Sequence, residues 1–179
     1  VSAESNFNVR ARSNKSAVGL WQFIASTGRI YGLKINRWID ERRDPILSTK
    51  AAITYLKHLY GIFGDWELAM AAYNTGEGRV SRAIKRAKKK GHKYNYSSLR
   101  LPRETRNYVP AIMALSIIYK NPERYGFGHV KKISPLDETQ GNLPVSFSLE
   151  EVAKRSKMSF RTLRELNPAL YLGVPPMKQ

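Results

Sequence analysis

The chain has 179 residues and a strong positive charge: 31 lysines and arginines stand against 14 aspartates and glutamates, a net charge of +17 at pH 7. This length accommodates one domain with a real core and a small second module, and the hydrophobic fraction of 42% indicates a folded chain. The absence of cysteine excludes disulfides, zinc–thiolate sites and cysteine nucleophiles. No apolar run approaches the roughly 18 to 20 residues that a membrane-spanning helix needs.

The positive charge predicts attraction to polyanions without selecting one of them. Nucleic acid, anionic lipid and acidic cell-wall polymers all respond to such a field, because its long-range part does not depend on chemical detail. The densest basic run is RAKKK at residues 86–90. Such a run is typical of a solvated helix face, and the alternative is a patch that binds an anionic wall polymer or a membrane surface.

The first part of the chain predicts two helices that end at glycines. One or two helical turns are expected between residues 17 and 27, ended by Gly28. Asp44 and Pro45 predict a second helix start, because the carboxylate can cap first-turn amides and the fixed φ of proline fits the first helical position. That helix should end at Gly64 and carry on one face the apolar residues Ile46, Ile53, Leu56, Tyr60 and Phe63.

Three further segments follow in the middle of the chain. Asp65 is expected to cap a helix that runs through Ala72, followed by a turn over residues 73–78, where two glycines and an asparagine favour positive φ. Residues 80–90 and 103–119 predict two more helices, and Pro110 is expected to kink the second. Residues 94–101 between them read as irregular.

The composition changes beyond residue 122 to glycine, proline, serine and aspartate, as expected of a linker. Ser148 and Glu151 then have the spacing of a capping box, which predicts a short helix over residues 148–156. A second short helix is expected over residues 159–166, with Val152, Leu163 and Leu166 filling a small core. A segment of 35 residues is marginal alone and needs flanking strands or docking on the main domain.

Several kinds of catalysis lack their signatures in this sequence. The histidines His58, His92 and His129 show no metal-ligand spacing, and no glycine-rich phosphate loop precedes a helix. The G-x-S-x-G elbow of serine hydrolases is also absent. We therefore expect no metal site and no cofactor.

The most acidic cluster of the chain contains Asp40, Glu41 and Asp44. Because Arg42 and Arg43 lie between these carboxylates, the cluster predicts a salt-bridge network or a helix cap rather than a second catalytic carboxylate.

Four short segments carry a resemblance to a known family. In chain order they are Glu4-Ser5, GLWQF at 19–23, AYNTG at 72–76 and ETRNYV at 104–109. Each is weak alone, and the four in this order are specific. Over residues 1–127 the chain resembles the lytic transglycosylases of the soluble-transglycosylase (SLT), goose-lysozyme-like class, and is most similar to the membrane-bound type D branch.

The resemblance implies a mainly α fold, with a lysozyme-like SLT domain and a glycan groove at residues 1–127. The composition and capping signals add a linker at 128–144 and a small two-helix segment at 145–179. The last segment resembles, more loosely, a LysM-type glycan-binding repeat whose final strand is absent or degenerate. Family members carry a helix ahead of the catalytic glutamate, and only three residues precede it here. We expect any export signal in that upstream part.

The resemblance also assigns roles to individual residues. Glu4 matches the catalytic glutamate, Ser13 and Gln22 match polar groups that position the substrate, and Ile24 matches an apolar groove position. Tyr73 and Asn74 match the substrate-binding tyrosine and asparagine of the family's central motif. Glu104 and Tyr108 match a later substrate-binding pair, which braces the catalytic centre.

Each assignment has a simpler alternative. A glutamate near a chain end is usually a solvated surface residue. Tyr73 and Tyr108 are by default core aromatics with a bonded hydroxyl. Glu104 can instead cap a helix or pair with Arg103 or Arg106.

The implied reaction cleaves the β-1,4 bond after N-acetylmuramic acid and leaves a 1,6-anhydro ring without adding water. One carboxylate suffices, because the 2-acetamido oxygen can stabilise the cationic anomeric carbon and the sugar's own 6-hydroxyl can attack it. Glu4 would protonate the leaving oxygen and then accept the proton of that hydroxyl. Burial is expected to raise its pKa so that it starts protonated.

The alternatives are a hydrolytic muramidase of the same fold, a non-catalytic peptidoglycan-binding protein, and a basic nucleic-acid binder, which has the charge but no groove-reading motif. We expect peptidoglycan glycan strands as the partner, no nucleic acid, and a monomer. The expected location is the bacterial envelope, periplasmic or associated with the outer membrane.

Overall fold

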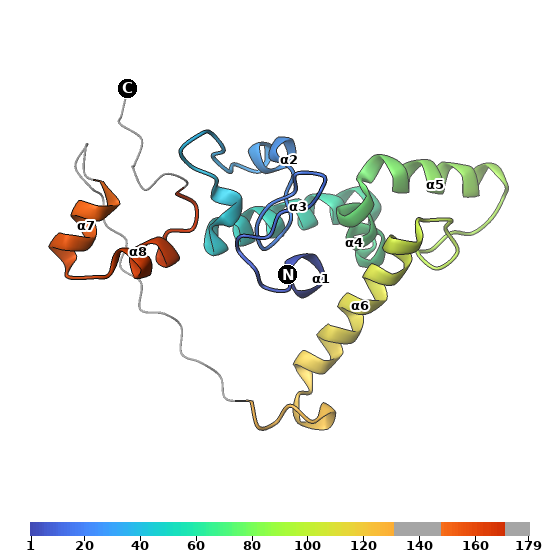
Figure 1. The fold of residues 1–179 in the computed structure, drawn as a ribbon. Coiled ribbons are helices and arrows are strands. Elements are labelled where there is room, and N and C mark those ends of the chain that lie inside the picture. Colours follow the sequence, from blue (N-terminus) through green and yellow to red (C-terminus); the bar gives the residue numbers. More distant parts are fainter. Residues whose placement is uncertain (131–147, 171–179) are drawn as a thin grey trace. The chain divides into compact units, whose positions relative to one another are not determined.

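A computed structural model describes residues 1–130 and 148–170 (Figure 1). Within these ranges the chain forms eight α-helices, two 3-10 helices and isolated β-bridges, and no strand. It divides into two compact units, one of residues 1–54 with 138–179 and one of residues 55–137. The predicted mainly α fold is confirmed. In the described ranges no helix combines the length and the apolar character that crossing a membrane requires.

The chain begins with a short helix and a long irregular segment. Helix α1 covers Ser2–Ser5, and the next helix, α2, covers Ala25–Ile30. Between them Val18 forms antiparallel bridges with both Arg12 and Phe23. The turns of helix predicted over residues 17–27 are therefore wrong for most of that range.

Gly28 does not end a helix as predicted, because it lies buried inside α2. A Cβ atom at this position would lie 3.1 Å from Cδ1 of Ile35, so the glycine permits close packing. Sequence pattern alone does not separate this use of glycine from a helix stop.

Helix α3, Pro45–Phe63, follows the 3-10 helix η1, Glu41–Arg43, and its predicted start and end are confirmed. The Asp44 carboxylate accepts hydrogen bonds from the backbone N–H groups of Ile46 at 2.9 Å and Leu47 at 2.7 Å. Gly64 follows with φ of 66°, the left-handed conformation that suits a glycine after a helix.

The buried face of α3 differs from the predicted one. Ile46 and Ile53 are 46% and 47% exposed, whereas Ala51, Ala52 and Leu59 are buried. Two apolar stripes run along this helix at similar spacing. The buried stripe is the one that contains Ala51, Ala52 and Leu59.

Helices α4, Trp66–Thr75, α5, Glu77–Lys89, and α6, Arg103–Lys120, belong to the second unit, where α4 packs against both α5 and α6 (Figure 1). Asp65 caps α4 as predicted, accepting a hydrogen bond from the Leu68 N–H at 2.9 Å. The core of this unit is made of Leu59, Leu68, Ala69, Ala71, Ala72, Val80, Tyr96, Leu99, Leu101 and Val109.

The turn predicted over residues 73–78 is almost absent. Tyr73, Asn74 and Thr75 continue α4, and Gly76 alone, with φ of 90°, separates it from α5. Burial of the Ala71-Ala72 face against the core extends the helix past the point where turn-forming residues begin.

Helix α6 begins as predicted and contains Pro110; its expected kink stays a prediction. Residues 94–101 are irregular as predicted, although Tyr96 and Leu99 in this stretch are buried. A short 3-10 helix, η2, Glu123–Tyr125, follows α6.

Two short helices lie near the C-terminal end, α7, Leu149–Ser156, and α8, Phe160–Leu166. The predicted capping box is confirmed: the Ser148 hydroxyl accepts from the Glu151 N–H at 3.2 Å, and the Glu151 carboxylate accepts from the Ser148 N–H at 2.8 Å.

The small core of these helices differs in part from the predicted one. Leu163 is buried and Val152 partly buried, but Leu166 is 40% exposed. Leu149 and Ala153 complete the buried cluster. Most of the predicted linker lies outside the described residues, and so does the C-terminal end, where the final strand of a LysM repeat was expected to be absent or degenerate.

Candidate active site

Glu4 lies on α1 and is half-buried. Its neighbour Ser5 donates a hydrogen bond from its hydroxyl to the carbonyl oxygen of Leu20 at 2.9 Å. This bond joins the first of the four sequence motifs to the second. Helix α1, which carries Glu4, is thus anchored through Ser5 to Leu20, 15 positions further along the chain.

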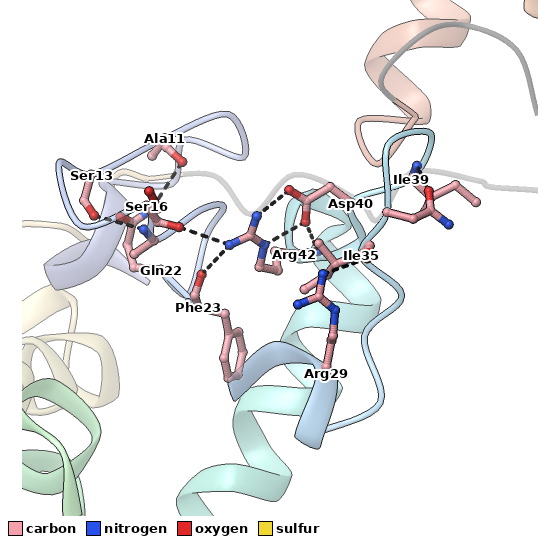
Figure 2. A network of polar contacts seen from close by, with 12 residues as sticks. Ala11, Ser13, Ser16, Gln22, Phe23, Arg29, Ile35, Ile39, Asp40 and Arg42 are labelled. Atoms are coloured by element: carbon pink, nitrogen blue, oxygen red, sulfur yellow. Dashed lines mark hydrogen bonds and ion pairs between the residues drawn. The ribbon is translucent and has the colours of Figure 1, made fainter. Parts of the chain in front are cut away.

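Ser13 and Gln22 belong to the irregular segment of residues 11–24 (Figure 2). The Ser13 hydroxyl accepts hydrogen bonds from the N–H groups of Lys15 at 3.2 Å and Ala17 at 3.1 Å, which closes a tight turn. Its half-buried side chain therefore has a fixed direction.

Gln22 has a left-handed backbone, with φ of 48°. Its amide nitrogen donates to the carbonyl of Gly19 at 2.8 Å and, with a longer contact, to that of Ala11 at 3.4 Å. Both amide hydrogens are therefore used inside the segment, whereas the amide oxygen accepts nothing from the described residues. That oxygen can accept a hydrogen bond from a sugar hydroxyl or N–H group.

Ile24 precedes α2 in an extended conformation and is 45% exposed, whereas Phe23 beside it is buried. The role of Ile24 as an apolar groove position stays a prediction.

Asn74 lies near the end of α4, and its side-chain oxygen accepts a hydrogen bond from the hydroxyl of Thr105 on α6 at 2.8 Å. Thr105 is 1% exposed, and its carbonyl accepts from the hydroxyl of Tyr96 at 3.0 Å. These bonds join the third and fourth sequence motifs. Burial raises the pKa of Tyr96, and the charge of Glu67 acts in the same direction.

Tyr73 and Tyr108 are half-buried and pack against the core of the second unit. The ring of Tyr73 lies 5.2 Å from that of Tyr55 at a tilt of 41°. Tyr73 and Tyr108 thus pack as core aromatics do, and both side chains remain partly exposed. Glu104 is exposed on the first turn of α6, where it neither caps the helix nor pairs with a described arginine.

The eight predicted residues fall into two groups. Glu4, Ser13, Gln22 and Ile24 belong to one compact unit, and Tyr73, Asn74, Glu104 and Tyr108 belong to the other. Within the described ranges no three histidine, aspartate or glutamate side chains gather in a way that could hold a metal ion.

The acidic cluster forms the structural network predicted for it. Asp40 is fully buried, and its carboxylate pairs with the Arg42 guanidinium at 2.8 Å. Asp44 caps α3. The reach of Arg42 to residues 16 and 23 was not predicted, and neither was the role of Thr105. No short sequence pattern predicts these contacts, because donor and acceptor are 19 to 31 positions apart in the chain.

Residues 1–96, which include three of the four motifs, match the family described as Transglycosylase SLT domain. The chain belongs to this family. The predicted resemblance to SLT transglycosylases is thereby confirmed.

Three similar proteins extend the comparison. Membrane-bound lytic murein transglycosylase D of Escherichia coli K12 is 44% identical over 169 residues, which cover 92% of this chain and 36% of that protein. Peptidoglycan transglycosylase gp16 of phage T7 is 28% identical over 158 residues, covering 87% of this chain and 11% of gp16.

The Putative tributyltin chloride resistance protein of Alteromonas sp. M-1 is 46% identical over 90 residues, covering 50% of this SLT chain and 44% of that protein. The chain thus spans 36% of the length of the E. coli relative.

Proposed function

We propose that this SLT chain is a peptidoglycan lytic transglycosylase, which cleaves the β-1,4 bond between N-acetylmuramic acid and N-acetylglucosamine and leaves a 1,6-anhydro end. The observation that carries the proposal is the SLT match over residues 1–96, which includes Glu4. Two similar proteins are named as murein or peptidoglycan transglycosylases, which supports the same substrate.

Glu4 supplies both proton transfers of the proposed reaction. Its carboxyl proton goes to the glycosidic oxygen as the bond from that oxygen to the anomeric carbon breaks. The 6-hydroxyl oxygen of the same sugar then bonds to the anomeric carbon, and its proton returns to the Glu4 carboxylate. No water is consumed, and the enzyme ends in its starting protonation state.

The other predicted residues bind and orient the glycan. Gln22 accepts a hydrogen bond through its amide oxygen, Ser13 contributes its hydroxyl, and Ile24 contacts an apolar sugar face. Asn74 already accepts from Thr105 through its oxygen, so its amide nitrogen remains to donate to an acetamido carbonyl.

The late residues have supporting roles in this proposal. Tyr73 contributes its half-buried aromatic side chain to glycan binding, while Tyr108 and Glu104 on α6 brace the catalytic centre, as the resemblance implies.

The deciding experiment digests purified sacculi with the parent chain and with Glu4→Gln, and identifies the products by mass spectrometry. Glu4→Gln keeps the side-chain shape but has no proton to donate, so the yield of 1,6-anhydro ends should fall by at least about 100-fold. Reducing ends instead of anhydro ends would identify a hydrolytic muramidase. Equal, negligible release by both chains, with retained binding to sacculi, would identify a non-catalytic binding protein.

Because peptidoglycan is the proposed substrate, we infer a location in the bacterial envelope, periplasmic or associated with the outer membrane. We also propose that the chain is a monomer. The name of the E. coli relative states that it is membrane-bound, which supports the envelope location. The segment of α7 and α8 is proposed to bind glycan as a LysM-like module.

Helix α5 is the proposed contact with an anionic wall polymer or membrane surface. One face of the helix is seated in the core through Val80, and the rest carries the exposed cations Arg79, Arg82, Lys85, Arg86, Lys88 and Lys89. None of the six forms an ion pair with a described residue. Unpaired cations along one helix favour contact with closely spaced negative charges.

A further inference from the structure

Arg42 is a buried arginine in η1 that is almost fully occupied by hydrogen bonds. Its guanidinium donates through Nε to Oδ1 of Asp40 and through Nη2 to Oδ2, both at 2.8 Å. The Arg42 residue is 7% exposed and Asp40 is 0% exposed. A two-bond pair of this kind fixes the plane of the guanidinium as well as its position.

The third nitrogen of the fork reaches the segment of residues 11–24. Nη1 of Arg42 donates to the carbonyl oxygens of Ser16 and Phe23, each at 3.1 Å (Figure 2). These two carbonyls flank the stretch that contains Gln22, and Ile24 follows directly. The Arg42 side chain therefore links both ends of this stretch to η1: Ser16 lies 26 positions before Arg42, and Phe23 lies 19 positions before it.

The backbone of the segment lies directly against η1 at Gly19. A Cβ atom there would lie 1.8 Å from the Arg42 carbonyl oxygen, and Gly19 has φ of 83°. Only a residue without a side chain permits this approach.

The segment also holds two non-glycine residues in the left-handed region, Ser16 with φ of 59° and Gln22 with φ of 48°. Such conformations cost free energy and persist where surrounding contacts impose them. The fork of Arg42 supplies contacts of that kind on both sides of Gln22.

We propose that Arg42 is a positioning residue for glycan binding: paired with Asp40, it holds residues 11–24 in the conformation that presents Ser13, Gln22 and Ile24 to the substrate. The inference rests on the proposed function for the identity of the ligand. Arg42 itself does not touch the glycan and acts through the backbone of this segment.

Lysine does not replace arginine in this role. An ammonium group is a compact point charge and can pair with Asp40, but it lacks the planar fork that reaches a carboxylate and two carbonyl oxygens together. Arg42→Lys therefore preserves the charge while releasing the carbonyls of Ser16 and Phe23.

The test measures glycan binding in chains that cannot turn over, with Glu4→Gln as the background. Calorimetry with purified glycan chains gives Kd with and without Arg42→Lys, at a temperature where circular dichroism shows both chains folded. The expected change is a Kd raised about ten-fold, because the released segment must be reordered on binding.

Val80→Ala in the same background is the matched control. Val80 is fully buried on α5, so the truncation lowers the melting temperature through a cavity without touching residues 11–24. This control should keep the Kd of the Glu4→Gln background. An equal loss of affinity in both variants would show that Arg42 contributes stability alone and would overturn the proposal.

Hydrogen exchange provides a readout that is independent of the glycan. The N–H groups of Ser13, Val18 and Gly19 donate within the segment to Ala17, Phe23 and Ala11. In Arg42→Lys these amides should exchange about ten-fold faster or more, while those of α4 keep their protection.

The two readouts separate the possible failures. Unchanged exchange in the segment overturns the positioning role whatever the chain binds. Faster exchange with an unchanged Kd shows that the segment is anchored by Arg42 but is not the glycan contact, which also overturns the proposal. Anhydro products missing from the parent chain contradict the lyase activity alone.

Discussion

The segment of residues 11–24 and the bundle of α4, α5 and α6 carry motifs of the same family and are stabilised differently. In the bundle, Asp65 caps α4 three residues away, and apolar side chains fill a core. In the segment, the key contacts come from Ser5 before it and from Arg42 well beyond it. Local contacts define the bundle helices, whereas distant polar contacts define the segment that carries Gln22.

This difference predicts that equivalent substitutions will have unequal effects in the two regions. A change in the segment should remove several long-range contacts together. A change in the bundle should remove one local contact and leave the core in place.

The largest effect is expected for Gly19→Ala. The added methyl group meets the Arg42 carbonyl oxygen, a backbone atom that cannot move aside, so the unfolding free energy should fall by about 4 kcal/mol or more. Gly64→Ala is the matched change after α3, where φ is also positive but nothing lies within 4 Å, and should cost about 1 to 2 kcal/mol. Urea denaturation followed by circular dichroism measures both, and equal losses would contradict the comparison.

Asp40→Ala and Asp65→Ala form the second pair. Removing the buried Asp40 carboxylate leaves the guanidinium of Arg42 without its counter-ion, which should cost about 3 to 5 kcal/mol. Asp65→Ala removes one helix cap and should cost about 1 kcal/mol. Urea denaturation measures the difference, provided that the dependence of the unfolding free energy on urea concentration is the same in both variants. A smaller loss of unfolding free energy for Asp40→Ala than for Asp65→Ala would show that the pair of Asp40 and Arg42 is dispensable.

Thr105→Val tests the polar contact that the bundle does use. It keeps the shape of the side chain and removes the hydrogen bond to Asn74, for an expected loss of about 1 to 2 kcal/mol. If Asn74 binds the glycan, release of anhydro products should also fall. Thr105→Ser retains the hydroxyl and is the control, with product release close to the parent level. Full activity in Thr105→Val would remove Asn74 from the proposed binding set.

The smallest effect on stability is expected from neutralising α5. Replacing Arg82, Lys85, Arg86 and Lys89 together by glutamine should change the unfolding free energy by less than about 1 kcal/mol, because these cations are exposed and form no ion pair with residues of the described ranges. Sedimentation with vesicles containing anionic lipid, and with sacculi carrying anionic polymer, should nevertheless show weaker, salt-sensitive binding.

The matched control for α5 neutralises four exposed lysines on other elements, Lys34, Lys50, Lys57 and Lys120. Both variants lose the same charge. An equal loss of binding would show that net charge, and not α5, attracts the anionic surface.

Sequence reasoning predicted the features that depend on near neighbours. The start of α3 at Asp44, the cap at Asp65 and the capping box at Ser148 all join residues two or three positions apart. Interactions over such distances are present as soon as the local backbone forms, so a sequence pattern is enough to predict them.

The failures involve choices that only packing makes. Gly28 was predicted to end a helix and instead lies buried within one. The predicted apolar face of α3 included Ile46 and Ile53, which are exposed, and Ala51 and Ala52 are buried instead. Tyr73 continues α4 because the core below it favours a longer helix.

The sequence by itself determined the helical class, the starts of α3, α4 and α7, and the four family motifs, because these depend on residue types at fixed short spacings. Tertiary structure alone decided how the motifs are held: Ser5 to Leu20, Thr105 to Asn74, and Arg42 to the segment around Gln22. Each of these bonds spans 15 or more positions, and it forms only when folding brings donor and acceptor together and buries or partly buries them.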